Sequence, residues 1–285
     1  MEQSRLTRRL VKRFVAGHSL AEALAVCRRL KGEGILSTLD YLGENVASAA
    51  EAAESAEKAR EAIRLIRDNG LPATISIKLT QFGLDISEEE CRGNVTKAVE
   101  AARAAGTQVE VDMESSEYVD RTLDLVRRLH GEYGNVRAVI QAYLYRSEQD
   151  VRQLCRERVP VRLCKGAYLE PAGVAFPEKT RVDGNYRKLM RILLEEGAVP
   201  ALATHDEALL VEAGLIVKEL GLKPEQYEFQ MLYGVRRRLQ RRLVEEGHRL
   251  RLYVPYGEAW YPYFMRRLAE RPANVVFLVR QLAGG

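Results

Sequence analysis

The sequence is poor in the residues that build disulfide frameworks and metal sites. Its cysteines form no C-x-x-C pair, and its histidines lack metal-ligand spacing. These residues are Cys27, Cys91, Cys155, Cys164, His18, His130, His205 and His248. No stretch approaches the roughly 20 apolar residues of a membrane span, and the start, MEQSRLTRRLVKRF, lacks a secretory apolar region. We therefore expect a cytoplasmic protein with neither structural disulfides nor a metal.

A large excess of one sign of charge is also missing, because the net charge is only +4. The strongest basic run is RRRLQRR at 236–242. Such a run could attract nucleic acid or an anionic membrane surface. A solvated helix face is its more common role. We expect that role here, with no nucleic acid as a partner.

Short β-rich runs alternate with helical patterns along the whole chain. Strands are expected at 35–42, 73–79, 108–113, 136–143, 159–164, 200–204, 227–232 and 249–254. Helices are expected at 48–69, 87–105, 117–132, 147–156, 184–197, 207–220, 235–246 and 258–270, after an additional helix at about 3–31. Eight such units predict an α/β fold in which the strands close into a parallel (βα)8 barrel.

The expected organisation is a single domain over 1–285, with an N-terminal arm at 1–31 and a barrel at 35–274. A doubly wound open sheet is the alternative. If it bound a dinucleotide, it would normally carry a G-x-G-x-x-G turn, which this sequence lacks. A dinucleotide cofactor would therefore have to be held in another way.

Polar residues follow six of the expected strands, at the edge where active sites of such barrels lie. They are Lys78, Asp112, Glu114, Gln141, Arg162, Lys165, Thr204, His205 and Gln230. Lys78 and Asp112 could form only a structural ion pair, but polar groups on so many strands predict a site. Arg162 lies in an apolar run and is costly there without an anionic or electron-rich partner. His205 could be a catalytic base or a satisfied polar residue, and no nucleophile motif accompanies it.

A second concentration of unusual residues lies at 253–274. If 258–270 is helical, Tyr263, Arg266 and Arg267 share one face. Paired guanidiniums suit a carboxylate ligand, although a charged outer face is the alternative. The density of aromatic residues favours a lined pocket. These residues are Tyr253, Tyr256, Trp260, Tyr261, Tyr263 and Phe264.

Together these segments resemble the proline dehydrogenase family, including the catalytic domain of proline utilisation A. The matching stretches are LDYLGE (39–44), SIKLT (76–80), RLCKGAY (162–168), ATHD (203–206), EFQMLYG (228–234) and YVPYG with YPYFMRRLAERPAN (253–274). The resemblance implies a distorted TIM-type barrel whose eighth helix lies over the strand ends. It also implies FAD as cofactor and oxidation of L-proline to Δ1-pyrroline-5-carboxylate, by hydride transfer from proline C5 to flavin N5, with a quinone as electron acceptor.

The resemblance also implies roles for individual residues. The substrate carboxylate is expected to meet Arg266, Arg267 and Lys78, with Asp112 pairing Lys78. The ring is expected to lie among Tyr168, Leu232, Tyr253 and Tyr263. The cofactor is expected to meet Gln141 and Arg162 at the flavin, Lys165, Gly166, Ala167, Thr204 and His205 at the ribityl and phosphate part, Glu270 at the adenosine, and also Gln230. Glu44 is expected to pair with Arg266 and gate the site.

One departure from the family pattern is Cys164, which replaces the usual valine and is expected to be a buried structural thiol. The resemblance leaves the oligomeric state open and admits peripheral docking on the inner face of a membrane. Two other functions remain in view. A Schiff-base aldolase would use Lys165 or Lys78, and a basic binding module would use the arginines at 236–242.

Overall fold

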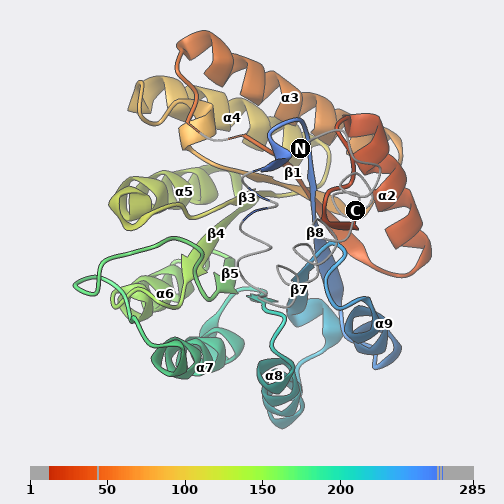
Figure 1. Cartoon of the computed structure of the whole chain (residues 1–285), viewed down its shortest axis with the longest axis vertical. Helices are drawn as coiled ribbons and strands as arrows, with labels where there is room; N and C mark the ends of the chain where they lie inside the picture. The colour runs from red at the N-terminus through yellow and green to blue at the C-terminus, as the bar shows by residue number, and fades with distance from the viewer. Residues whose placement is uncertain (1–12, 44, 262, 264, 266–285) are drawn as a thin grey trace, which may run out of the picture.

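Eight short strands hydrogen-bond in chain order and close into a barrel (Figure 1). The computed structural model describes residues 13–43, 45–261, 263 and 265. The strands are β1 (Leu36–Tyr41), β2 (Ala73–Ile77), β3 (Val109–Val111), β4 (Val136–Gln141), β5 (Val161–Cys164), β6 (Ala201–Ala203), β7 (Glu228–Leu232) and β8 (Leu250–Tyr256). All neighbours are parallel, and β8 closes onto β1. The expected closed barrel and all eight strands are confirmed.

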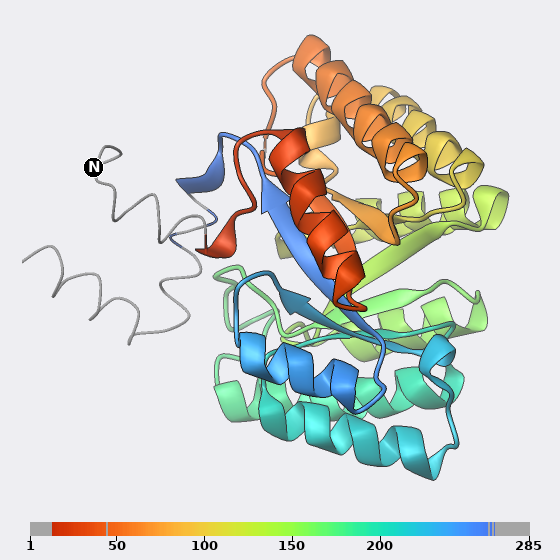
Figure 2. The same ribbon diagram turned by 90° about the vertical axis from the view of Figure 1, so that its right-hand side faces the viewer.

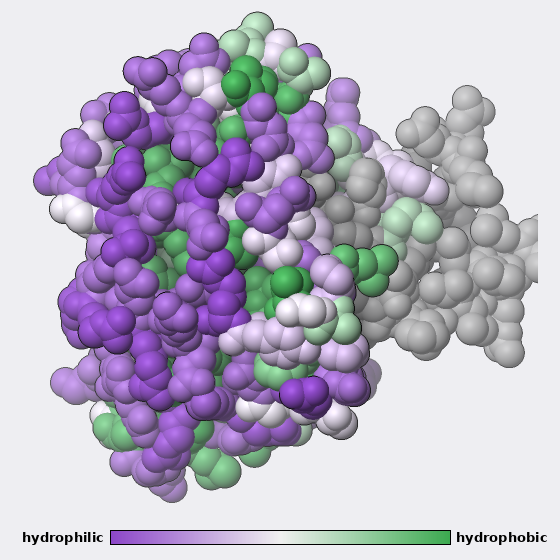
Figure 3. Space-filling view, turned by 90° about the vertical axis from the view of Figure 1, so that its left-hand side faces the viewer, coloured by the Kyte–Doolittle hydropathy of each residue, from purple (hydrophilic) through white to green (hydrophobic). Residues whose placement is uncertain are grey.

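Helices alternate with the strands and surround the barrel. They are α2 (Leu20–Gly32), α3 (Ala49–Asp68), α4 (Glu88–Ala104), α5 (Val119–Tyr133), α6 (Ser147–Arg156), α7 (Lys179–Glu196), α8 (Glu207–Glu219) and α9 (Arg237–Glu245), with short 3-10 turns at Thr80–Phe82, Ser116–Tyr118 and Pro224–Gln226. The face that carries α5 and α6 is largely hydrophilic (Figure 3), as expected where helices meet water. The apolar core therefore lies between the helices and the strands.

The helix expected at about 3–31 is wrong as a single element. Within the described residues, the chain leaves the helical conformation at 15–19, and α2 begins only at Leu20. Gly17 has φ +151, and Ser19 caps α2 in a capping box with Glu22. Figure 2 shows α2 lying against β8, which it contacts together with β1. The segment before it hydrogen-bonds the end of β8, where the amide of Gly257 donates to Gly17 O.

Two further helices begin at other residues than expected. Helix α7 starts at Lys179 rather than 184, and the amides of Arg181 and Val182 already bond Glu178 O. Helix α9 starts at Arg237 rather than 235, because Arg236 takes a left-handed conformation with φ +52. The helix expected at 258–270 begins at Trp260, and most of it lies outside the described residues.

Strand alternation sends apolar side chains outward and polar side chains into the barrel. In β5, Val161 and Leu163 are buried in the outer apolar core, whereas Arg162 bonds groups of other strands inside the barrel. The same period places Glu110 inside β3 and Arg137 inside β4, where the two side chains form an ion pair. Because successive side chains of a strand point to opposite faces, this barrel holds charged groups where bulky branched residues usually stand.

Candidate active site

A cavity of about 620 Å³ opens at the carboxyl ends of the strands. Every residue to which the family resemblance assigns a role, and which the structure describes, lines it. These are Lys78, Asp112, Gln141, Arg162, Lys165, Gly166, Ala167, Tyr168, Thr204, His205, Gln230, Leu232, Tyr253 and Tyr263. Glu114, which was also expected near the site, bonds Thr80 instead. Arg266, Arg267, Glu270 and Glu44 lie outside the described residues. The cavity volume falls within the roughly 300–1,000 Å³ of ordinary ligand and cofactor sites.

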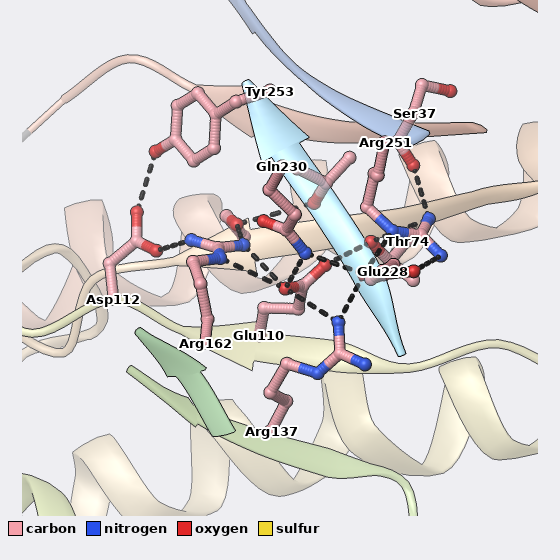
Figure 4. Close-up of polar contacts among 12 residues, drawn as sticks. Ser37, Thr74, Glu110, Asp112, Arg137, Arg162, Glu228, Gln230, Arg251 and Tyr253 are labelled. Atoms are coloured by element: carbon pink, nitrogen blue, oxygen red, sulfur yellow. Dashed lines mark hydrogen bonds and ion pairs between the residues drawn. The ribbon is translucent and has the colours of Figure 1, made fainter. Parts of the chain in front are cut away.

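The cavity floor rests on a buried ionic network inside the barrel (Figure 4). Glu110 Oε2 accepts hydrogen bonds from Arg162 Nη2 at 2.6 Å, Gln230 Nε2 at 3.2 Å and Arg137 Nη1 at 3.4 Å. Its other oxygen accepts from Thr74 Oγ1 at 2.6 Å. Burial by itself would raise the pKa of Glu110, but attraction to the surrounding arginines outweighs it and lowers the pKa to about 2. Glu110 is therefore ionised at neutral pH.

Glu228 is the second anionic centre of this network. Arg137 Nη1 and Arg251 Nε donate to its Oε1 at 2.6 and 2.9 Å, and Gln230 Nε2 donates at 2.7 Å. Burial opposes ionisation here too, yet attraction to Arg251 and Arg137 holds the pKa of Glu228 well below its ordinary value. Arg137 thus bridges Glu110 and Glu228, which makes the barrel interior one connected unit.

Arg162 connects this network to the cavity. Its guanidinium donates to Glu110, to Ser76 Oγ at 2.8 Å and to Asp112 Oδ1 at 2.5 Å. Its Cζ lies 5.4 Å from the centre of the Tyr253 ring. Attraction to the carboxylates overcomes the effect of burial and raises the pKa of Arg162. The sequence argument that this arginine needs an anionic partner is confirmed, and the partners are two carboxylates.

Among the described residues, the carboxylate closest to Lys78 is not the one expected. The Lys78 Nζ forms a longer ion pair with Asp112, at 3.7 Å, but hydrogen-bonds Asp40 Oδ1 at 3.1 Å. Asp112 is bonded mainly to Arg162 and to the Tyr253 hydroxyl, which donates at 2.6 Å. Asp40 was missed as a site residue, although a charged residue inside the apolar strand LDY was the available signal.

Lys165 lies at the rim of the cavity between two carboxylates. Its Nζ donates to Asp183 at 2.5 Å and to Asp206 at 3.0 Å. Lys179, which also lines the cavity, bonds Asp183. Burial opposes ionisation of both carboxyls, but Lys165 lowers the pKa of each. Asp183 and Lys179 were missed because a helix begins at 179 that was expected only at 184.

His205 accepts rather than donates a hydrogen bond at one ring nitrogen. The Leu232 amide donates to Nε2 at 2.9 Å, so this nitrogen carries no proton. His205 thereby joins the end of β6 to the end of β7. This contact matches the second of the two expected roles, a polar residue whose hydrogen bonds are satisfied. Gln141, which lines the cavity, donates from Nε2 to the Glu114 carbonyl at 2.8 Å.

Two segments from outside the barrel also reach the cavity. Tyr263, in the first turn of the helix that begins at Trp260, is buried and lines it. This position fits a helix over the strand ends. Arg13 and Phe14 line it from the N-terminal arm, and Phe14 packs in one apolar cluster with Trp260 and Tyr263. Nothing in the sequence indicated this contact of the arm.

Cys164 is half-buried and lines the cavity, so the expectation of a buried thiol is wrong, whereas its structural role stays a prediction. Its Sγ donates to Ile140 O at 3.4 Å. Burial raises the pKa of the thiol to about 12.

Among the described residues, no cluster of His, Cys, Asp and Glu has the makeup of a metal site, and no helix is long and apolar enough to cross a membrane.

Residues 23–280 match the family model described as proline dehydrogenase. Proline dehydrogenase 1 of Bacillus subtilis (strain 168) is 41% identical over 274 residues, which are 96% of this chain and 91% of that protein. The proline dehydrogenase of Deinococcus radiodurans is 42% identical over 281 residues, which cover 97% of this chain and 91% of the relative.

Solved structures share the fold. The proline utilization A of Bdellovibrio bacteriovorus, inactivated by N-propargylglycine, superposes with a TM-score of 0.86 at 28% identity. The match covers 92% of this chain but only 32% of that longer one. A Bradyrhizobium japonicum proline utilization A mutant, D779W, matches with a TM-score of 0.75 at 22% identity, over 93% of this chain and 31% of the other.

Proposed function

This chain belongs to the proline dehydrogenase family, and we propose that it oxidises L-proline to Δ1-pyrroline-5-carboxylate with FAD as its cofactor. It is an oxidoreductase. The observation that carries the proposal is one cavity at the strand ends that is lined by a lysine and aromatic side chains and also by amide, guanidinium and ammonium donors. We assign the first set to a substrate part, since it suits a cyclic amino acid, and the second set to a second part, since it suits an anionic, electron-accepting cofactor.

The substrate part is built around Lys78 and Tyr253. The Lys78 ammonium binds the proline carboxylate, together with Arg266 and Arg267 as the family resemblance implies. Tyr253, Tyr263 and Leu232 wall the pyrrolidine ring, with Tyr168 beside them. All four of these side chains line the cavity. Their apolar surface excludes water from the ring and holds C5 in one orientation.

The donor chemistry of the second part fits FAD. Arg162 presents a permanent cation where the flavin gains negative charge, and Gln141 contributes an amide at the ring edge. Lys165, Thr204 and His205, with the backbone at Gly166 and Ala167, serve the ribityl and phosphate part. Gln230 and Arg162 both donate hydrogen bonds to Glu110, so Gln230 helps to hold the carboxylate that positions Arg162. When bound, FAD supplies at N5 the acceptor for the hydride that leaves proline C5, and a quinone then reoxidises it.

The two competing functions are each opposed by specific contacts. A Schiff-base lysine must reach the neutral form to attack a carbonyl, but Lys165 is held between two carboxylates and Lys78 bonds Asp40. A basic binding surface at 236–242 would be weakened, because two of its five arginines, Arg236 and Arg242, pair with Glu207. Neither alternative explains why so many donors converge on one cavity.

The test is the spectrum and turnover of the purified protein after reconstitution with FAD. A flavin spectrum should appear, and anaerobic L-proline should bleach it. Heat-released cofactor should chromatograph as FAD, and its binding should raise the melting temperature, because it binds the native state alone. Release of FMN, or a spectrum unchanged by proline, would contradict the proposal. Borohydride trapping of a carbonyl compound in flavin-free protein would favour the aldolase.

A further inference from the structure

Lys78 lies between two carboxylates that belong to different strands. Its Nζ is 3.1 Å from Asp40 Oδ1 and 3.7 Å from Asp112 Oδ2, so only the contact with Asp40 is a hydrogen bond. The register explains the closer contact, because Asp40 of β1 pairs with Ser76 of β2, two residues before Lys78. Residues two apart on a strand share a face, so both side chains leave the neighbouring strands toward the same side.

The oxygens of Asp112 are engaged by other donors. Arg162 Nη1 donates to Oδ1 at 2.5 Å, and the Tyr253 hydroxyl donates to Oδ2 at 2.6 Å. Charge-assisted hydrogen bonds of this length are the strong ones. Removal of Lys78 would therefore leave Asp112 with two close partners.

Asp40 depends on Lys78 far more. Its side chain is only 2% exposed, and no group in the described part of the chain donates a hydrogen bond to its Oδ2. The Tyr253 hydroxyl lies nearby but donates to Asp112. Burial raises the pKa of the Asp40 carboxyl, and attraction to Lys78 opposes that rise. An unpaired buried carboxylate is costly, so the buried Asp40 carboxylate depends on its hydrogen bond from Lys78.

We propose that Asp40 is the positioning residue of Lys78, whereas Asp112 positions Arg162 and Tyr253. The inference rests on the proposed function, in which Lys78 binds the substrate carboxylate. Asp40 holds the ammonium at the end of β2, and Asp112 holds the guanidinium and phenol that face the cofactor and the substrate ring. Both carboxylates line the same cavity, but each acts on a different part of the reaction.

The first experiment compares melting temperatures of the FAD-saturated protein in two mutant cycles. Lys78→Met leaves Asp40 unpaired, so adding Asp40→Asn should raise the melting temperature above that of Lys78→Met. Adding Asp112→Asn instead should lower it further, because Arg162 loses a partner. The proposal would be overturned if, in the Lys78→Met background, Asp40→Asn lowered the melting temperature and Asp112→Asn raised it. Both comparisons remain readable if the single Asp40→Asn protein does not fold, and Lys78→Gln can replace Lys78→Met as background.

The second experiment measures binding of a carboxylate-bearing proline analogue that cannot be oxidised, through the change in flavin absorbance. Asp40→Asn should raise its Kd, and the KM for proline, by about 10-fold or more, the cost of one misplaced charged hydrogen bond. Flavin content and kcat should change little. In the Lys78→Met background, Asp40→Asn should have no additional effect, whereas Asp112→Asn should still lower kcat.

If Asp40→Asn raised the Kd of the analogue by the same factor in the wild type and in the Lys78→Met background, the pairing would be contradicted. Asp40 would then act through some group other than Lys78. Such a result is distinguishable from failure of the proposed function. If the wild-type protein did not oxidise proline, the melting-temperature cycles would still report which carboxylate pairs Lys78. If proline oxidation were normal but the cycles were additive, the assignment of Asp40 alone would be wrong.

Discussion

Tyr253 joins three parts of the site through one side chain. Its hydroxyl donates to Asp112, its ring lies against the Arg162 guanidinium, and it lines the cavity where we place the substrate ring. We expect a ring in that position to leave little room for an added hydroxyl on the substrate. The residue therefore combines a polar anchor with an apolar wall, which is the usual use of tyrosine in binding sites.

We predict that Tyr253→Ser narrows the preference for proline over 4-hydroxyproline, chiefly by lowering kcat/KM for proline. Tyr253→Phe is the matched control, since it keeps the ring and removes only the hydrogen bond to Asp112. It should retain the preference while losing turnover on both substrates. Steady-state kinetics with the two substrates checks this. A preference unchanged in Tyr253→Ser would mean that Tyr253 does not contact the ring.

Cys164 borders the cavity but should not take part in chemistry. Because burial raises the pKa of its thiol to about 12, the group stays neutral at physiological pH. Cys164→Val conserves volume and should cost less than about 1.5 kcal/mol of unfolding free energy. Urea denaturation and proline turnover measure both effects. A large loss of turnover in a stable variant would show that the thiol contacts a reacting group.

At the scale of elements, the proposed binding of the substrate carboxylate depends on the helix that begins at Trp260. Tyr263, in its first turn, lines the cavity, and Arg266 and Arg267 follow one turn later in the sequence. If the helix continues, the three residues share one face at i, i+3 and i+4. The arginines themselves lie outside the described residues.

We predict that Arg266→Met or Arg267→Met lowers kcat/KM for proline by about 30-fold or more, since truncating one partner of a buried charge pair costs roughly 2–5 kcal/mol. Flavin content should stay near that of the wild type, because the arginines grip the substrate. Arg64→Met, on the exposed side of α3, is the control and should leave kcat/KM unchanged. Normal proline oxidation in both single variants would make this helix an ordinary outer helix.

For the whole molecule, the most unusual feature is a charged barrel interior. Equal numbers of basic and acidic side chains meet there. They are Lys78, Arg137, Arg162 and Arg251 with Asp40, Glu110, Asp112 and Glu228. Breaking one member of such a network leaves an uncompensated buried charge, typically at a cost of about 3–5 kcal/mol. The network thus couples the stability of the barrel to the placement of Arg162 at the cavity floor.

The network also predicts a dependence of stability on pH. The pKa of Glu110 is lowered in the folded protein from 4.5 to about 2. The unfolded chain therefore binds this proton first as the pH falls, so the stabilisation is complete above about pH 4.5 and is lost between pH 4.5 and 2. The free-energy difference between wild type and Glu110→Gln should be constant from pH 7 to 5 and shrink at pH 4 and 3. Urea denaturation at these pH values checks it, and a constant difference throughout would refute it.

The sequence by itself determined the barrel and the polar residues at the ends of six strands. The two-residue period of strands such as VEVDMES and VRLCKGAY reveals which residues face inward, and the order of strands and helices leaves few other topologies. Residues after the strands had to gather at one end, because parallel strands place their carboxyl ends together.

Only the tertiary structure decided which inward-facing groups pair. Lys78 hydrogen-bonds Asp40 and forms only a longer ion pair with Asp112. Arg137 bridges Glu110 of β3 and Glu228 of β7. Such choices depend on strand tilt and stagger, which set the distances across a closed barrel and leave no periodic trace in the sequence. The contact of Phe14 with the cavity is of the same kind. It brings together distant segments of the chain, and packing energy rather than local pattern determines it.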